Sequence, residues 1–113
     1  MVVLIAILAS VPLGLAQAQV RPDHAKKMAK GLAIFRDGVG QALKQRCVKC
    51  HGGEKVRGEL DITTRNLLLK GGSEGPAVMP GSAKTSRLFK LISHTEKPHM
   101  PAKGGKLPAG LIA

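Results

Sequence analysis

Residues 47–51 read CVKCH, and they hold both cysteines of the 113-residue chain with a histidine directly after the second. Cysteines and a histidine at this spacing are compatible with a haem attachment site, half of a zinc site, a redox-active dithiol or a chance arrangement in a small basic protein. The sequence on either side of the motif discriminates among these four interpretations.

The first 20 residues carry no charged side chain and are mostly apolar from Val2 to Leu15. They lead into Ala16-Gln17-Ala18, which has the small-x-small form of an export cleavage site. The sequence therefore predicts a secretory signal peptide at residues 1–18 and a domain at residues 19–113.

A retained membrane anchor and a buried core helix are the alternatives for this apolar stretch. Pro12 and Gly14 interrupt it well short of the roughly 20 apolar residues that a spanning helix needs. We therefore expect an exported, periplasmic or extracytoplasmic protein, in a compartment that would oxidise a cysteine pair unless something else bound it.

The positive charge falls entirely within the predicted domain. The chain has 18 Lys and Arg against 7 Asp and Glu, a formal net charge of +11, and all of them follow residue 20. Such a field attracts nucleic acids, anionic membranes or acidic proteins. Two Phe and no Tyr or Trp leave few surfaces on which bases could stack. The sequence predicts acidic protein partners, no nucleic acid, and membrane contact only if the signal is retained.

A helical pattern precedes the motif between Asp23 and Arg46. Asp23 is placed to cap the helix, and glycines near Gly38 leave open whether one helix or two span this region. The motif follows its C-terminal end. Apolar residues recur at steps of three or four, as on one buried helical face: Met28, Leu32, Phe35, Val39 and Leu43.

Short helices and long loops follow the motif. A helix capped by Thr63 or Thr64 is predicted through residue 69, and another after residues 82–86. Residues 71–82 and 97–105 are rich in Gly and Pro and predict loops, and Pro108 suits the first turn of one more helix. The fold class is therefore small and all-α, with more irregular chain than so small a domain stabilises without a ligand.

Haem c supplies such a ligand. In a Cys-x-x-Cys-His motif, Cys47 and Cys50 can form thioethers with the two vinyl groups of one porphyrin, while His51 ligates the iron. A zinc site would need His94 or His99 as a fourth ligand, although structural zinc sites usually space their second pair differently. A thioredoxin-like dithiol would need alternating strands and helices, and none is visible.

The second axial ligand has several candidates. Met79 and Met100 both precede a proline in a loop, where a thioether could point inward or simply fill space. His94 and His99 are alternatives, and Met28 is more simply explained as part of the core. The residues alone leave this choice open.

The chain resembles the planctomycete-type cytochrome c domain, a monohaem c-type cytochrome, from Phe35 to Leu107. The resemblance rests on FRDGVGQALKQRCVKCHGG, RGELDITTRNLLLKGGSEGPAVMPGSAKTSRLFKLI and HMPAKGGKL. It implies a small c-type cytochrome fold around one covalently bound haem. It also implies Met100 as the distal ligand, with Met79, His99 and His94 as alternatives.

Two departures from the family's pattern are visible. Gln41 stands where members commonly have proline, which is minor. Members also continue into a final helix that packs across the first one, whereas this chain stops at LPAGLIA. The resemblance thus implies a C-terminally truncated domain, with the apolar face of residues 28–43 uncovered, as in a fragment of a larger exported protein or a domain completed by a partner.

The function expected from these features is one-electron transfer by iron held between His51 and Met100. A thioether ligand raises the reduction potential, and a filled sixth position argues against an enzyme. The alternatives are a haem enzyme or gas-binding domain with an open position, an electron-transfer module of a larger protein, and a zinc or interaction module without haem. Basic residues near the motif and the distal loop are expected to steer acidic partners: Lys49, Lys55, Lys97, Lys103 and Lys106.

Overall fold

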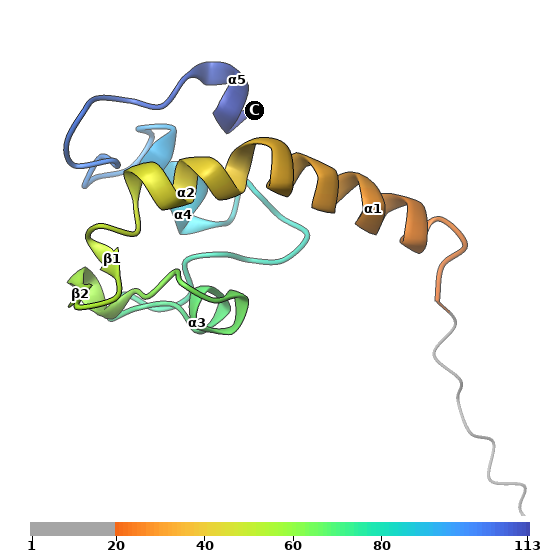
Figure 1. The fold of residues 1–113 in the computed structure, drawn as a ribbon, viewed down its shortest axis with the longest axis horizontal. Coiled ribbons are helices and arrows are strands. Elements are labelled where there is room, and N and C mark those ends of the chain that lie inside the picture. The colour runs from red at the N-terminus through yellow and green to blue at the C-terminus, as the bar shows by residue number, and fades with distance from the viewer. Residues whose placement is uncertain (1–19) are drawn as a thin grey trace, which may run out of the picture.

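A long helix dominates the computed structural model, which describes residues 20–113; the predicted signal peptide lies outside this part. The helix comprises α1 (His24–Ile34), a π-helical turn (Phe35–Val39) and α2 (Gly40–Arg46). The backbone stays helical at both junctions, so the glycines do not divide it in two (Figure 1).

The π-helical turn lies where a glycine lets an aromatic ring approach the backbone. A Cβ added to Gly40 would lie 3.1 Å from the carbonyl oxygen of Phe35 and 3.2 Å from its ring. At the start of the helix, Asp23 is the predicted N-cap residue but makes no capping hydrogen bond. Its carboxylate instead lies 2.5 Å from Lys27 Nζ, a pair at i,i+4 spacing.

A two-stranded antiparallel sheet begins at the last residue of the motif, so the prediction of an all-α fold is wrong in this detail. β1 (His51–Gly52) pairs with β2 (Lys55–Val56), with His51 opposite Val56. Gly53, in the two-residue turn between them, has a φ of +61°, a conformation that glycine adopts without strain. The helical period seen before the motif gave no sign of this tight hairpin.

The segment after the hairpin matches the predicted short helix. A 3₁₀ turn (Arg57–Glu59) leads towards α3 (Arg65–Lys70), whose first turn is capped by the Thr64 hydroxyl, which accepts from the Leu67 N–H at 3.2 Å. The helix ends at Gly71, with a φ of +80° and the Gly75 carbonyl where a Cβ would lie. Thr64, rather than Thr63, is therefore the cap.

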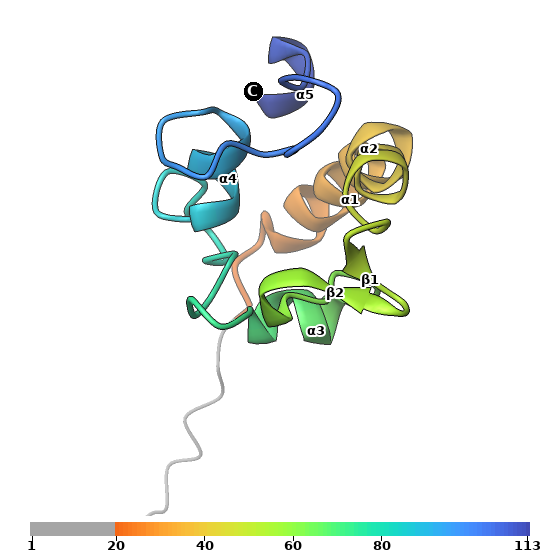
Figure 2. The ribbon, with the colours of Figure 1, turned by 90° about the vertical axis from the view of Figure 1, so that its left-hand side faces the viewer.

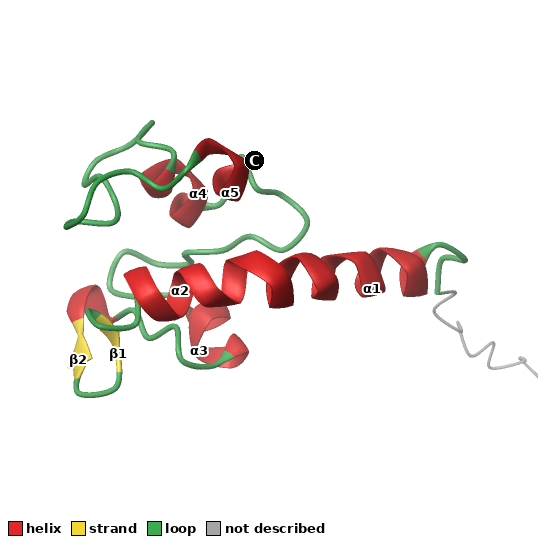
Figure 3. Ribbon diagram, turned by 45° about the horizontal axis from the view of Figure 1, so that its top comes forward, coloured by secondary structure: helices red, strands yellow, loops and turns green. Residues whose placement is uncertain are grey.

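Two further helices complete the described chain. α4 spans Arg87–Ile92, and α5 spans Ala109–Ile112 directly after Pro108. In Figure 2, α4 lies across from the long helix and α5 lies above both. Figure 3 shows α3 and the small sheet on the other side of the long helix from α5.

The described chain has little conventional core. Within residues 20–113, Ala77 and Leu107 are the buried apolar residues, and no large side chain is fully buried. Met28 is 61% exposed and Leu32 is 67% exposed. The prediction that Met28 belongs to the core is wrong, because α1 extends away from the other elements (Figure 1) and periodicity does not tell whether a face is covered.

None of the helices within residues 20–113 combines the length and the apolar character needed to cross a bilayer.

Candidate functional site

The C-terminal end of α2 delivers the motif as a compact turn. Cys47 caps the helix and its N–H donates to the Leu43 carbonyl at 3.0 Å. The Cys47 carbonyl then accepts from the N–H groups of Cys50, at 3.0 Å, and His51, at 2.9 Å. These successive hydrogen bonds fix the backbone spacing of the three candidate haem-binding residues.

The imidazole of His51 is oriented by a backbone carbonyl. His51 Nδ1 lies 3.0 Å from the Arg57 oxygen. Because a carbonyl oxygen only accepts hydrogen bonds, Nδ1 carries the proton and the neutral ring keeps its lone pair on Nε2. Metal-ligating histidines are commonly held in this way, with the second nitrogen donating to a carbonyl or carboxylate.

Backbone hydrogen bonds join the motif to the segments that follow it. The Cys50 carbonyl accepts from Arg57 N–H and the His51 carbonyl accepts from Ile62 N–H, both at 2.9 Å. Gly52 is buried, and a Cβ there would lie 2.7 Å from the Thr63 methyl group. The proximal segment, residues 47–63, is therefore held together by backbone hydrogen bonds on either side of His51.

A small apolar hollow of about 70 Å³, partly open to solvent, lies beside Cys47. Such a lining suits the hydrophobic faces of a porphyrin, with a thiol already at its wall. Its walls come from the π-helical turn, α2 and the cysteine after it, α4, α5 and the loop before α5: Val39, Ala42, Leu43, Cys47, Leu88, Ile92, Leu107 and Leu111.

Burial also affects the chemistry of the cysteines, which are both free thiols. It raises the pKa of the Cys47 thiol above the ordinary value of 9.0, and the positive charge of Arg46 only partly opposes this shift. The thiol is therefore protonated at neutral pH. A redox-active dithiol usually has a lowered pKa, so this environment argues against that alternative.

The backbone of Met100 is anchored to the end of α4. Its N–H donates to the Leu91 carbonyl at 3.0 Å, and its carbonyl accepts from His94 Nε2 at 3.1 Å. Leu91 lies between Leu88 and Ile92, which both line the hollow. Met100 is half-buried, and the structure thus ties it to the helix that forms one wall of the candidate site.

The other candidates for the distal position have different surroundings. Met79 is 46% exposed, and its N–H donates to the Ser86 hydroxyl at 2.9 Å. His94 uses Nε2 to hold Met100, and its ring stacks on that of exposed His99 at a centroid distance of 4.3 Å. Met28 lies on the exposed part of α1.

A long-range contact that the sequence did not predict joins Arg46 to the loop of residues 97–105. Arg46 Nη2 donates to the carbonyls of Gly104, at 2.7 Å, and Gly105, at 3.1 Å. Both glycines have a positive φ, of +81° and +75°. The Gly-Gly pair predicted a loop, but no local pattern identified its partner, which lies directly before Cys47.

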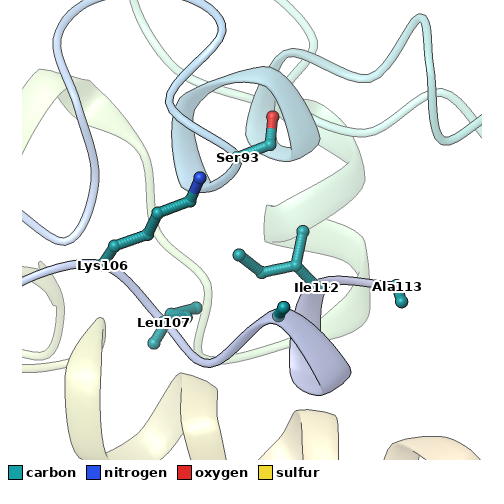
Figure 4. Close-up of a pocket in the computed structure, with 6 residues that line it drawn as sticks. Ser93, Lys106, Leu107, Ile112 and Ala113 are labelled. Atoms are coloured by element: carbon teal, nitrogen blue, oxygen red, sulfur yellow. The ribbon is translucent and has the colours of Figure 1, made fainter.

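The remaining alternatives find little support among the described residues. No group of three or more His, Cys, Asp or Glu side chains within residues 20–113 is arranged to hold a metal ion, which leaves the zinc interpretation without a described ligand set. A wider, open hollow lies between the end of α4 and α5, where Lys106 and Ile112 extend towards Ser93 (Figure 4). It contains none of the motif residues, so the smaller hollow beside Cys47 is the candidate site.

Two thiols in a Cys-x-x-Cys turn, a following histidine with a free Nε2 and an adjoining apolar hollow fit covalently bound haem and define a site of the c-type cytochrome class. The family described as planctomycete cytochrome C matches residues 47–104, just over half of the chain. The chain therefore belongs to this family, as its sequence blocks predicted, and haem binding and electron transfer follow at that level. No curated protein and no solved structure matches the chain.

Proposed function

We propose that this chain is an exported electron carrier, rather than an enzyme, that binds one haem c through Cys47 and Cys50 and ligates its iron with His51 and Met100. The hydrogen bond between His51 Nδ1 and the Arg57 carbonyl carries the proposal, because it leaves Nε2 as the ring's metal-binding atom. When bound, haem c supplies an iron that gains or loses one electron.

The residues of the proximal segment hold the ligand in place. The Arg57 carbonyl fixes the tautomer and plane of His51, and the bond from Ile62 to the His51 carbonyl fixes its backbone. With haem bound, the apolar side chains around Cys47 would exclude water from it and would limit the reorganisation that accompanies a change of iron charge. The chain thus contributes orientation and a low-polarity surrounding.

Met100 is the distal ligand in this proposal. Its half-buried position and its two backbone hydrogen bonds to the α4 end support it over Met79, which is 46% exposed. His94 is less suited because its Nε2 already binds a carbonyl, and His99 is exposed. A thioether ligand would give a higher potential than a second imidazole.

The proposal also covers location and partners. We assign residues 1–18 as a signal peptide, residues 19–113 as the exported domain and the periplasm or another extracytoplasmic space as its location, with membrane contact only if the signal is retained. The five lysines named for steering are all exposed, and the net charge is +11. Such a surface favours acidic redox proteins over nucleic acid, since few aromatic side chains are present.

The distal ligand is tested by comparing two methionine variants of the haem-loaded protein. Met100→Ala should remove the weak sulfur-to-iron band of the ferric protein and lower its reduction potential, while the matched control Met79→Ala should leave both unchanged. Loss of the band in Met79→Ala instead would reject Met100. A reduced wild-type spectrum that shifts on adding carbon monoxide would favour the open-position alternative.

A further inference from the structure

We propose that His94 is a positioning residue for Met100: its ring holds the Met100 carbonyl and thereby fixes the backbone from which the thioether extends. This inference rests on the proposed role of Met100. The contact itself is between His94 Nε2 and the Met100 oxygen, 3.1 Å apart. Because the carbonyl only accepts, Nε2 is the donor.

The backbone conformation of His94 points to a role for its side chain. α4 ends in a Schellman motif, in which Thr95 N–H donates to the Lys90 carbonyl at 3.0 Å and His94 N–H donates to the Leu91 carbonyl at 3.3 Å. His94 occupies the left-handed position of this motif, with a φ of +64°. Glycine is the usual residue there, so a histidine accepts backbone strain that its ring contact can explain.

The same turn anchors Met100 on its other side. The Leu91 carbonyl, which accepts from His94 N–H, also accepts from Met100 N–H at 3.0 Å. Both polar groups of the Met100 backbone are therefore bound by the C-terminal end of α4. Leu88 and Ile92 of α4 line the hollow, so the helix that binds the Met100 backbone also forms part of the candidate haem site.

Two neighbouring contacts limit the freedom of the His94 ring and its loop. The His99 ring stacks on it with an interplanar angle of 6°. Glu96 lies between the two histidines in the sequence, and its carboxylate accepts a hydrogen bond from Arg87 Nε at 3.0 Å. This bond holds the loop against α4. The stacked ring is thus constrained to the orientation in which Nε2 reaches Met100.

The test compares His94→Gly with His94→Gln and His99→Ala in the haem-loaded protein. Glycine removes the ring but suits the left-handed position, so the variant should fold with a thermal midpoint equal to or above that of the wild type. Amide exchange at Met100 should become about 2- to 10-fold faster, as expected for loss of one hydrogen bond. The sulfur-to-iron band should weaken and the potential should fall.

The other two variants separate the hydrogen bond from the stacking. His94→Gln keeps a donor of similar reach and should restore part of the band and of the Met100 amide protection. His99→Ala removes only the stacked ring and should change both less than His94→Gly does. A wild-type band, potential and Met100 exchange rate in His94→Gly would overturn the proposal.

Failure of the proposed function gives a different pattern. If Met100→Ala leaves the band unchanged, Met100 is not the ligand, and the assignment of His94 as a positioning residue for a ligand is overturned with it. If Met100→Ala abolishes the band while His94→Gly leaves it intact, only the inference about His94 fails.

Discussion

The two candidate axial ligands are held in different ways. His51 is fixed within the proximal segment, residues 47–63, by partners at most eleven positions away in sequence, such as Arg57 and Ile62. The distal segment, residues 91–105, combines local bonds at Met100 with a contact from Arg46, 58 and 59 positions from its two acceptors. We infer that the proximal side is locally determined, whereas the distal side depends on the assembled fold and opens first.

The largest effect is expected from removing the covalent attachment on the proximal side. Cys47→Ala combined with Cys50→Ala should yield a protein without covalently bound haem and without a cooperative thermal transition, because little else fills the core. Haem staining after denaturing electrophoresis measures the covalently bound haem, and circular dichroism measures the thermal transition. The control Lys49→Ala, at an exposed position inside the motif, should keep the haem.

A smaller effect is expected from overfilling the proximal segment. Gly52→Val should lower the free energy of unfolding by about 1–3 kcal/mol, since a Cβ at this position would lie 2.7 Å from the Thr63 methyl group and 3.2 Å from Val48 Cγ1. Denaturant unfolding measures the change. The control Gly31→Ala meets no atom within 4 Å and should stabilise the helix by about 0.5–1 kcal/mol. Equal stability of Gly52→Val and the wild type would contradict the packing described.

The distal side is expected to respond separately to loss of its long-range contact. Arg46→Ala should cost about 1 kcal/mol and speed amide exchange in the loop around Gly105, because two carbonyls lose their donor. Exchange at Ile62, on the proximal side, should not change. Lys44→Ala, on an exposed position of the same helix, is the control. Equal acceleration at both sites would show that the two segments open together.

The smallest effect is expected from protonation of Asp61 at low pH. The Thr63 hydroxyl and N–H, 2.6 and 2.8 Å from Asp61 Oδ1, hold the pKa of this carboxyl below its ordinary value of 3.8. Its contribution to stability is therefore complete above the unfolded-state pKa and is lost as the pH falls through the lowered folded-state pKa. A carboxyl NMR titration should show this shift, and Thr63→Val should bring the pKa back towards 3.8. A pKa at or above 3.8 in the wild type would reject the turn described.

Local patterns predicted those parts of the fold that depend on neighbouring residues. The helical period before the motif, the threonine cap of α3 and the helix after Ser86 are all present because period, capping and turn chemistry act over a few residues. The family was also identified correctly, and its match covers residues 47–104. The small sheet and the π-helical turn were not predicted, since the first depends on the positive φ of Gly53 and the second on a close approach at Gly40.

The contacts of the distal side could not be predicted from such patterns. Arg46 and its acceptors are separated by more than half of the described chain. The sequence offers His94 as a candidate ligand, but no local pattern predicts its left-handed backbone or its bond to Met100. Periodicity places Met28 on an apolar face but does not tell whether another element covers that face. The ligand pair itself stays a prediction.

Covalent binding of one haem by CVKCH is measured by the intact mass of the protein, expressed with the haem c maturation machinery and analysed under denaturing conditions. We expect the polypeptide mass plus one haem, with the increment localised to the peptide containing Cys47 and Cys50. A mass equal to that of the polypeptide alone, from a colourless protein, would contradict it.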